Sequence, residues 1–197
     1  MMFIKKRIEQ FKSLPKYRQQ AIYVKYLLVF GIFFTLIAAM AAIKVTPMAT
    51  YRNKEYKFKI RYPKYWDVYT PKGPMVAFVS PLVDDVDWFQ ESVNVTTIYV
   101  GQRKPSVEEF ATVAVRQLVG VYEDNIELMQ SRPYKIGPYP GHLVIFAGRK
   151  TDTPFKYMIG IFIKNDTAFM VTYAALEEDF DDYLNAVRAM FRSVRVS

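Results

Sequence analysis

The apolar positions of the chain follow two different patterns, one before and one after residue 45. Residues 26–43 form a run of eighteen apolar or small residues without a charged side chain. As a helix such a run extends about 27 Å, close to the roughly 30 Å hydrocarbon core of a bilayer. The residues just before it extend the helix, and the ammonium group of Lys25 reaches back to the lipid surface. The pattern predicts a single N-terminal transmembrane helix over residues 21–43.

After this helix the apolar period changes to two, which is typical of strands with one buried face. In the first strand the apolar positions Tyr56, Phe58, Ile60 and Tyr62 alternate with the basic positions Lys57, Lys59 and Arg61. Further strands are predicted over residues 67–69, 75–80, 92–100, 142–149, 155–163 and 168–173. Residues 165–166, Asn-Asp, predict a hairpin turn between the last two strands, and the Pro- and Gly-rich residues 132–141 predict a turn-rich connection.

Two segments of this region have the helical period instead. Ser106 and Glu109 form the pattern of a capping box, which opens a helix that ends near Tyr122. Its predicted inward stripe is Phe110, Val113, Ala114, Gln117, Leu118 and Val121. Residues 177–192 predict a second helix, with acidic side chains in the first turn, where the helix dipole favours them. Strands, helix, strands and helix in this order predict an α+β domain whose antiparallel sheet is covered by helices.

The sequence thus divides into a basic segment (1–20), a transmembrane helix (21–43), a linker (44–50) and a folded domain (51–197). Most of the net charge of +8 precedes the domain: residues 1–44 hold eight Lys or Arg and one acidic residue, whereas the rest hold nineteen and eighteen. By the positive-inside rule, the N-terminus is expected in the cytoplasm and the domain on the extracytoplasmic side of a cell or thylakoid membrane. No nucleic-acid-binding motif is present, so nucleic acid is excluded as a partner.

Two features of the apolar run leave alternatives open. Residues 39–41, Ala-Met-Ala, have the form of a signal-peptidase site, but the run is longer than a signal-peptide core, which favours an uncleaved anchor. Small residues recur on one helical face at Gly31, Thr35, Ala39 (or the adjacent Ala38) and Ala42. Such a stripe predicts close packing against another helix in the membrane. The alternative is that small residues are simply common in membrane helices.

The domain carries a series of short motifs in a characteristic order. They are Tyr56-x-Phe58-x-Ile60-x-Tyr62-Pro63-x-x-Trp66, Phe78-x-Ser80-Pro81, Asp87-x-Phe89-x-Glu91-x-Val93-Asn94-Val95, Ser106-Val107-Glu108-Glu109-Phe110, the region of Gly141, residues 169–175, and Phe191-Arg192-Ser193-Val194. Together they cover nearly all of residues 51–197 and resemble the prokaryotic branch of the PsbP-like family, named after the extrinsic protein of photosystem II. The resemblance implies an α-β-α sandwich around a central antiparallel sheet and a non-enzymatic binding or assembly role. A transmembrane helix departs from these relatives, which are commonly secreted or lipid-anchored.

No residue pattern indicates catalysis, a cofactor or a metal. Cysteine is absent, His142 is the single histidine, and no nucleophile or phosphate-loop motif is present. We therefore predict no catalytic, cofactor-binding or metal residue. The acidic residues Asp84, Asp85, Asp87 and Glu91 leave a hard-cation site open, but without EF-hand spacing a solvated acidic loop is favoured.

Two groups of side chains are candidates for binding. Lys57, Lys59 and Arg61 on the exposed face of the first strand, with Arg52, Lys54 and Lys64 as further candidates, predict docking on acidic lipid head groups or on an acidic partner. The alternative is that these cations only protect an edge strand from pairing with other chains. Trp88 and Phe89 predict an exposed aromatic contact, with a role in the core as the alternative.

These features lead us to expect a non-catalytic, membrane-anchored accessory or assembly subunit that binds a membrane protein complex. The alternative is a stand-alone, envelope-anchored ligand- or lipid-binding domain. A third hypothesis, a hydrolase acting through acidic pairs, has no companion base in the sequence. The sequence names neither the partner complex nor a small-molecule ligand, and it leaves a photosynthetic role open.

Overall fold

The computed structural model describes residues 46–71, 75–82, 87–101, 105–122, 126–150 and 153–197, together with positions 15, 16, 20, 24, 25 and 28. Thr46–Ser197 forms one compact unit and Met1–Val45 another. Within the described residues, no helix is long and apolar enough to cross a membrane. Apart from the six positions named above, the predicted segment 1–20 and the predicted helix 21–43 lie outside the described residues.

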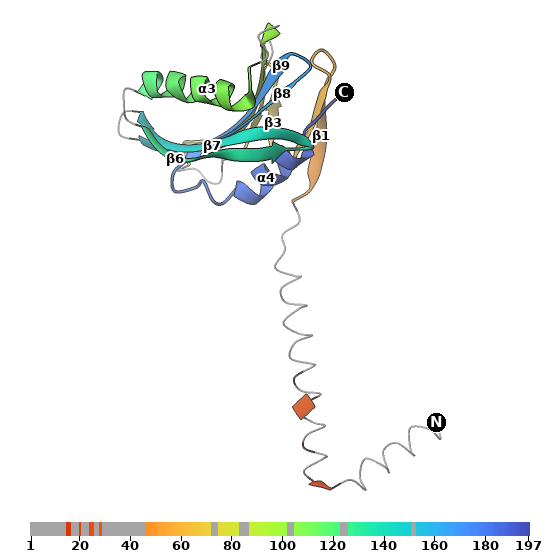
Figure 1. Cartoon of the computed structure of the whole chain (residues 1–197). Helices are drawn as coiled ribbons and strands as arrows, with labels where there is room; N and C mark the ends of the chain where they lie inside the picture. Colours follow the sequence, from red (N-terminus) through yellow and green to blue (C-terminus); the bar gives the residue numbers. More distant parts are fainter. Residues whose placement is uncertain are drawn as a thin grey trace. The chain divides into compact units, whose positions relative to one another are not determined.

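The unit Thr46–Ser197 is built on a seven-stranded antiparallel sheet with the strand order β3-β4-β5-β9-β8-β7-β6 (Figure 1). The strands are β3 (Asp67–Tyr69), β4 (Met75–Val79), β5 (Ser92–Tyr99), β6 (Ile126–Ile136), β7 (Tyr139–Lys150), β8 (Thr153–Lys164) and β9 (Thr167–Leu176). Residues 158–162 of β8 are buried without alternation. This pattern arises because both faces of the sheet are covered.

A helix lies on each face of this sheet, α3 (Val107–Tyr122) on one and α4 (Leu184–Ser193) on the other (Figure 1). Ala111 and Ala114 of α3 pack against Val144 and Ile159 of the sheet. On the opposite face, α4 shares the larger core with a second, three-stranded sheet of β1 (Met48–Asn53), β2 (Phe58–Pro63) and β10 (Arg195–Val196), ordered β1-β2-β10. The domain is therefore an α+β fold with a sandwich-like antiparallel sheet, as predicted.

Local sequence signals were confirmed where they depend on neighbouring residues. Ser106 Oγ accepts a hydrogen bond from the Glu109 N–H at 3.1 Å, and Glu109 Oε2 accepts one from the Ser106 N–H at 2.8 Å, which is the predicted capping box. Asn165 and Asp166 have φ values of +51° and +59°, the left-handed pair that a tight hairpin turn requires.

The predicted turn-rich connection over residues 132–141 was wrong. Most of it belongs to β6 and to the start of β7, which pair with each other around a turn at residues 137–138. Pro133 is tolerated within β6 because β6 is an edge strand, where a missing N–H need not remove a ladder hydrogen bond.

The predicted helix over residues 177–192 begins too early. Residues 177–182 form turns, and α4 starts at Leu184 without an acidic side chain in its first turn. The buried Phe180 holds these turns in place, because its carbonyl accepts a hydrogen bond from the Tyr173 hydroxyl at 3.0 Å. The acidic residues therefore do not serve the helix dipole of α4.

Three smaller corrections concern the start of the domain and the face of α3. Residues 48–50, assigned to the linker, belong to β1. The first predicted strand begins only at Phe58, because residues 54–57 form a turn in which Lys57 has a φ of +50°. In α3, Val113 and Gln117 are exposed, and Ala111 takes a place on the inward face.

Candidate functional site

A row of three basic residues crosses the three-stranded sheet. Arg52 of β1 and Arg195 of β10 are both directly opposite Lys59 of the central strand β2. Directly opposite residues of antiparallel strands carry their side chains on the same face. All three are exposed. Because like charges in this arrangement destabilise a sheet, the domain keeps this basic row at a cost in stability.

The other half of β2 packs against the end of α4. Ser193 Oγ accepts a hydrogen bond from the Arg61 N–H at 2.8 Å and donates one to the Met190 carbonyl at 2.6 Å. On the β1 side, Thr50 is opposite Arg61. These contacts hold the backbone of Arg61 next to the last turn of α4, which also carries Arg192.

Arg195 links α4 to the basic row. Its Nη1 donates hydrogen bonds to the carbonyl oxygens of Arg192 at 2.9 Å and of Val194 at 2.7 Å. These carbonyls lie at the C-terminal end of the helix, where the helix dipole favours positive charge. Among the described residues only these two hydrogen bonds of the guanidinium are seen, which leaves its Nε and Nη2 N–H groups for a ligand.

The turn between β6 and β7 fixes this end of α4. The Gly137 N–H donates to the Phe191 carbonyl at 2.9 Å, and the φ of Gly137 is +58°. A Cβ at this position would overlap the backbone oxygen of Val194, so a side chain cannot be accommodated. Beside it, the Tyr139 hydroxyl donates to the Val196 carbonyl at 2.9 Å and accepts from the Val196 N–H at 2.8 Å, which fixes β10.

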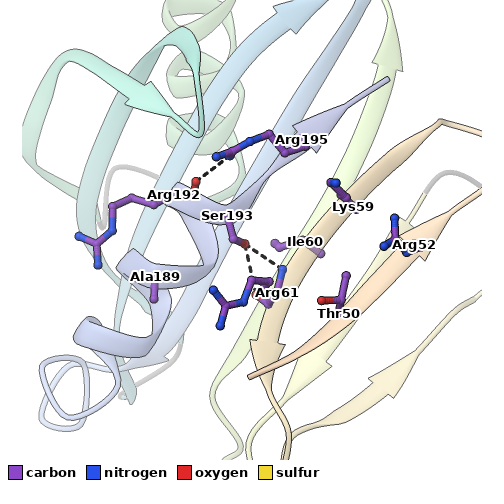
Figure 2. Close-up of a pocket in the computed structure, with 9 residues that line it drawn as sticks. All are labelled: Thr50, Arg52, Lys59, Ile60, Arg61, Ala189, Arg192, Ser193 and Arg195. Atoms are coloured by element: carbon purple, nitrogen blue, oxygen red, sulfur yellow. Dashed lines mark hydrogen bonds between the residues drawn. The ribbon is translucent and has the colours of Figure 1, made fainter. Parts of the chain in front are cut away.

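The basic side chains line an open groove of about 560 Å³ (Figure 2). The lining residues are Thr50, Arg52, Lys59, Ile60, Arg61, Ala189, Arg192, Ser193 and Arg195. Five of the nine are cationic, they come from β1, β2, α4 and β10, and none of the nine is acidic. Figure 2 shows the row Arg195, Lys59 and Arg52 in this order across the strands, with Arg61 below it. We call this feature the basic groove.

The structure brings together two of the three predicted basic residues and separates the third. Lys59 and Arg61 line the basic groove, whereas Lys57 does not. Lys57 lies in the turn before β2, where its carbonyl accepts a hydrogen bond from the Ser197 N–H at 2.9 Å. β2 pairs with β1 along its whole length but with β10 only at Phe58 and Lys59, so the alternative that these cations protect a strand edge stays open. Sequence reasoning missed Arg192 and Arg195 as partners of this strand.

The two residues of the predicted aromatic pair differ in exposure. Phe89 is half-buried, and its ring centroid lies 5.2 Å from that of Phe155. Trp88 is 66% exposed. It lines a second open cavity of about 550 Å³ with Thr153, Pro154, Leu176, Glu177 and Glu178. A binding role for Trp88 and Phe89 stays a prediction.

The acidic residues near this pair have different positions. Asp84 and Asp85 lie outside the described residues. Asp87 Oδ1 accepts a hydrogen bond from the Phe89 N–H at 3.1 Å, so it supports the local turn. In the part of the chain that the structure describes, no three His, Asp or Glu side chains are grouped so as to hold a metal ion.

Glu91 is a buried carboxyl with a structural partner. It is 3% exposed, and its Oε2 accepts a hydrogen bond from the Ser80 hydroxyl at 2.8 Å. Burial raises the pKa of Glu91, the nearby carboxylates of Asp179 and Asp87 add to the rise, and the Ser80 hydrogen bond opposes it. Ser80 and Glu91 join the end of β4 to the start of β5, since the Ser80 N–H also donates to the Glu91 carbonyl at 2.8 Å.

His142 is buried within β7, and its Nε2 lies 2.8 Å from Ser131 Oγ. Its Nδ1 has no hydrogen-bond partner among the described residues. Ser131 is exposed, and neither residue lines the basic groove.

The predicted positions for helix packing in the membrane are not part of this site. Gly31, Thr35, Ala39 and Ala42 lie outside the described residues. Their role stays a prediction.

Comparison with known proteins gives a likeness of fold. No protein-family model matches the chain, and no curated protein matches it significantly in sequence. Cyanobacterial PsbP (CyanoP) from Synechocystis superposes with a TM-score of 0.60 at 11% identity, over 79% of this chain and 96% of that protein. LpqN of Mycobacterium tuberculosis, involved in cell envelope biogenesis, gives 0.54 at 8% identity over 77% and 91%. The Ran-binding protein Mog1p of Saccharomyces cerevisiae gives 0.52 at 12% identity over 77% and 96%. At these identities the likeness concerns the fold alone, and the domain has a PsbP/Mog1-like fold.

Proposed function

We propose that this protein is a non-catalytic, membrane-anchored accessory or assembly subunit, and that its folded domain docks on an acidic surface of a membrane protein complex. The observation that carries the proposal is the basic groove, in which five cations from four elements meet without an acidic residue in the lining. Juxtaposed like charges cost stability in the free domain, and an acidic partner removes that cost on binding.

The composition of the groove favours recognition of carboxylate or phosphate oxygens. Four of its five cations are arginines, whose planar guanidinium groups bind such oxygens through two parallel hydrogen bonds. The basic row also extends over two strand spacings, roughly 10 Å. A distributed charge of this length suits a macromolecular surface better than one small anion.

The packing of the domain favours surface docking over storage of an apolar ligand. On one face of the sheet, Ala111 and Ala114 of α3 pack against it, and on the other face Val187, Met190 and Phe191 of α4 are buried in the larger core. Glu91, whose pKa burial raises, lines neither of the two cavities described above, which gives the hydrolase hypothesis no support. The fold also occurs in a Ran-binding protein, so it can serve as a scaffold for protein binding.

The proposed location rests on the sequence before the domain. The apolar run 26–43 would anchor the chain in a cell or thylakoid membrane, with the basic segment in the cytoplasm and the domain outside. Gly31, Thr35, Ala39 and Ala42 would pack against a helix of the same complex. Six residues lie between position 43 and Thr50 of the groove, and the seven Cα–Cα steps span at most about 25 Å, so the groove would stay close to the membrane surface.

A binding experiment with the full-length chain in nanodiscs of neutral lipid tests the role of the groove. The probes are poly-glutamate and vesicles containing anionic phosphatidylglycerol. The variant R52E/K59E/R61E should weaken poly-glutamate binding at least about tenfold, because three attractive charges become repulsive. The matched control K54E/K57E/K64E makes the same change in net charge at exposed residues outside the groove. It should retain most of the binding.

Each outcome decides between the hypotheses. Equal losses in both variants would show that only net charge matters and would remove the groove from the proposal. If the groove variant weakens binding to the vesicles and the chain does not bind poly-glutamate, the accessory-subunit hypothesis falls and the hypothesis of a stand-alone lipid-binding domain is favoured.

A further inference from the structure

We propose that the segment which occupies the basic groove is an acidic α-helix of the partner protein, lying across the three strands with carboxylates at positions i, i+3 or i+4, and i+7. This inference rests on the proposed function, because it specifies the partner of the same groove.

The strand register sets the spacing of the cations. Arg195, Lys59 and Arg52 are register neighbours across β10, β2 and β1. Neighbouring strands lie about 4.8 Å apart, so the backbone positions of the row are about 4.8 Å and 9.6 Å from its first member. A ligand that pairs with all three needs negative groups with nearly this repeat.

An α-helix provides this repeat on one face. At a rise of 1.5 Å per residue, positions i+3 or i+4 lie about 4.5 to 6 Å along the axis, and i+7 lies about 10.5 Å along it. These positions share one face of the helix. One carboxylate can therefore meet each cation of the row.

An extended segment fits less well. Its side chains on one face repeat at about 6.6 to 6.8 Å, so the third carboxylate would lie about 13 Å from the first. That exceeds the length of the row by about 4 Å. The spacing thus favours a helix over a strand.

The remaining lining residues provide a second contact beside the row. Arg61 is two residues from Lys59 on β2 and so points to the same face, about 6.6 Å along the strand. The lining residue opposite it on β1 is the short Thr50, and α4 contributes the small Ala189. These short side chains leave room for a helix, and Arg61 can reach a fourth carboxylate on its flank.

Two peptides of identical composition test the proposed spacing. Both are 18-residue, hydrocarbon-stapled Ala/Gln helices with three glutamates. In the first, the glutamates occupy peptide positions 4, 8 and 11, on one face; in the second they occupy positions 4, 9 and 14, spread around the helix. Circular dichroism confirms equal helicity, and fluorescence anisotropy measures binding to the full-length chain in neutral-lipid nanodiscs. The first peptide should bind at least about tenfold more tightly, since it pairs two more charges at once.

Variants separate this inference from the proposed function. Lys59→Gln should remove most of the preference for the first peptide, because it removes the middle cation of the row. If the two peptides bind with equal affinity and R52E/K59E/R61E loses both, the helical partner is overturned, while docking of the basic groove on an acidic partner still holds. Equal affinities that the groove variant does not change would overturn both. Groove-dependent binding to phosphatidylglycerol vesicles with no binding of either peptide would assign the site to lipid and overturn the helix as well.

Discussion

Neutralising Lys59 should stabilise the free domain, because the lysine lies between two other cations. Its register neighbours are Arg52 on one side and Arg195 on the other. At a charge separation of roughly 7 Å in water, each pair repels by about 0.6 kcal/mol before screening. The variant Lys59→Gln keeps a chain of similar length and removes both repulsions.

Salt gives this effect a signature that a packing effect would lack. With a Debye length of about 30 Å at 10 mM salt, the summed gain is about 1 kcal/mol; at 150 mM, with a length near 8 Å, it falls to about 0.5 kcal/mol. At 1 M salt it should be about 0.1 kcal/mol. Urea unfolding of the full-length chain in neutral detergent measures the gain, and fluorescence of Trp66, which is 3% exposed, reports loss of the core. For a denaturant slope near 2 kcal/mol/M, the midpoint should rise by about 0.5 M at low salt.

A second exposed strand lysine provides the control. Lys135 of β6 has the uncharged Pro140 as its register partner, so Lys135→Gln should leave the midpoint nearly unchanged. The reasoning would be refuted if Lys59→Gln and Lys135→Gln had the same midpoint at 10 mM salt, or if the gain of Lys59→Gln persisted at 1 M.

Three further predictions concern the buried carboxyl, a turn and the aromatic pair. Because burial raises the pKa of Glu91, the folded state binds its proton more tightly, and stability should fall as pH rises above the ordinary glutamate range. In thermal melts, the stability of Glu91→Gln minus that of the native chain should therefore be larger at pH 8 than at pH 4. The same difference at both pH values would contradict this. Gly137→Ala should lose at least about 2 kcal/mol, because it combines a left-handed backbone with overlap on a backbone oxygen. Gly101 is the control: its φ is +61°, but an added Cβ would meet only the Tyr99 side chain, at 3.5 Å. Gly101→Ala should therefore lose about 1 kcal/mol. Equal losses of the two variants in urea unfolding would show that the overlap with the Val194 oxygen contributes nothing at Gly137. Trp88→Ala should change stability by less than about 0.5 kcal/mol, because its ring is exposed. Phe89→Ala should cost about 1 to 2 kcal/mol, because its ring packs against Phe155. A larger loss for Trp88→Ala than for Phe89→Ala would show that Phe89 is not the packed ring of the pair.

The parts of the fold that sequence predicts well depend on close neighbours. The capping box at Ser106 and Glu109 and the hairpin at Asn165 and Asp166 each involve residues within three positions of one another. The alternation in β5 is equally local, and the structure confirms that strand. In such segments propensity, turn chemistry and tertiary packing favour the same conformation.

The errors arise where distant residues determine the conformation. Pro133 indicates a break, but it is tolerated because β6 is an edge strand, which only the complete sheet defines. Residues 177–182 have a composition that suits a helix N-terminus. Their turns are instead fixed by the burial of Phe180, by the hydroxyl of Tyr173 and by the ammonium of Lys156, 4.7 Å from the Phe180 ring centroid.

In the candidate site, too, the residues that local sequence determines were predicted and those that the tertiary fold brings in were missed. Alternation identified Lys59 and Arg61, because the face of a strand is a local property. Arg192 and Arg195 reach this strand only through the tertiary fold, as the hydrogen bond between Arg61 and Ser193 across 132 positions illustrates. Lys57 fitted the alternation but is separated from the groove by its left-handed backbone.

Cross-linking of the native complex tests the central proposal most directly. Native membranes would be extracted with a mild detergent, treated with a carbodiimide that joins amines to carboxylates, and separated on a native gel before mass spectrometry. The proposal predicts that the chain migrates with a large complex, and that Lys59 is joined to Asp or Glu residues of another subunit more often than the exposed Lys64 outside the groove. Migration as a single chain, with no more cross-links at Lys59 than at Lys64, would contradict an accessory subunit that docks through the basic groove.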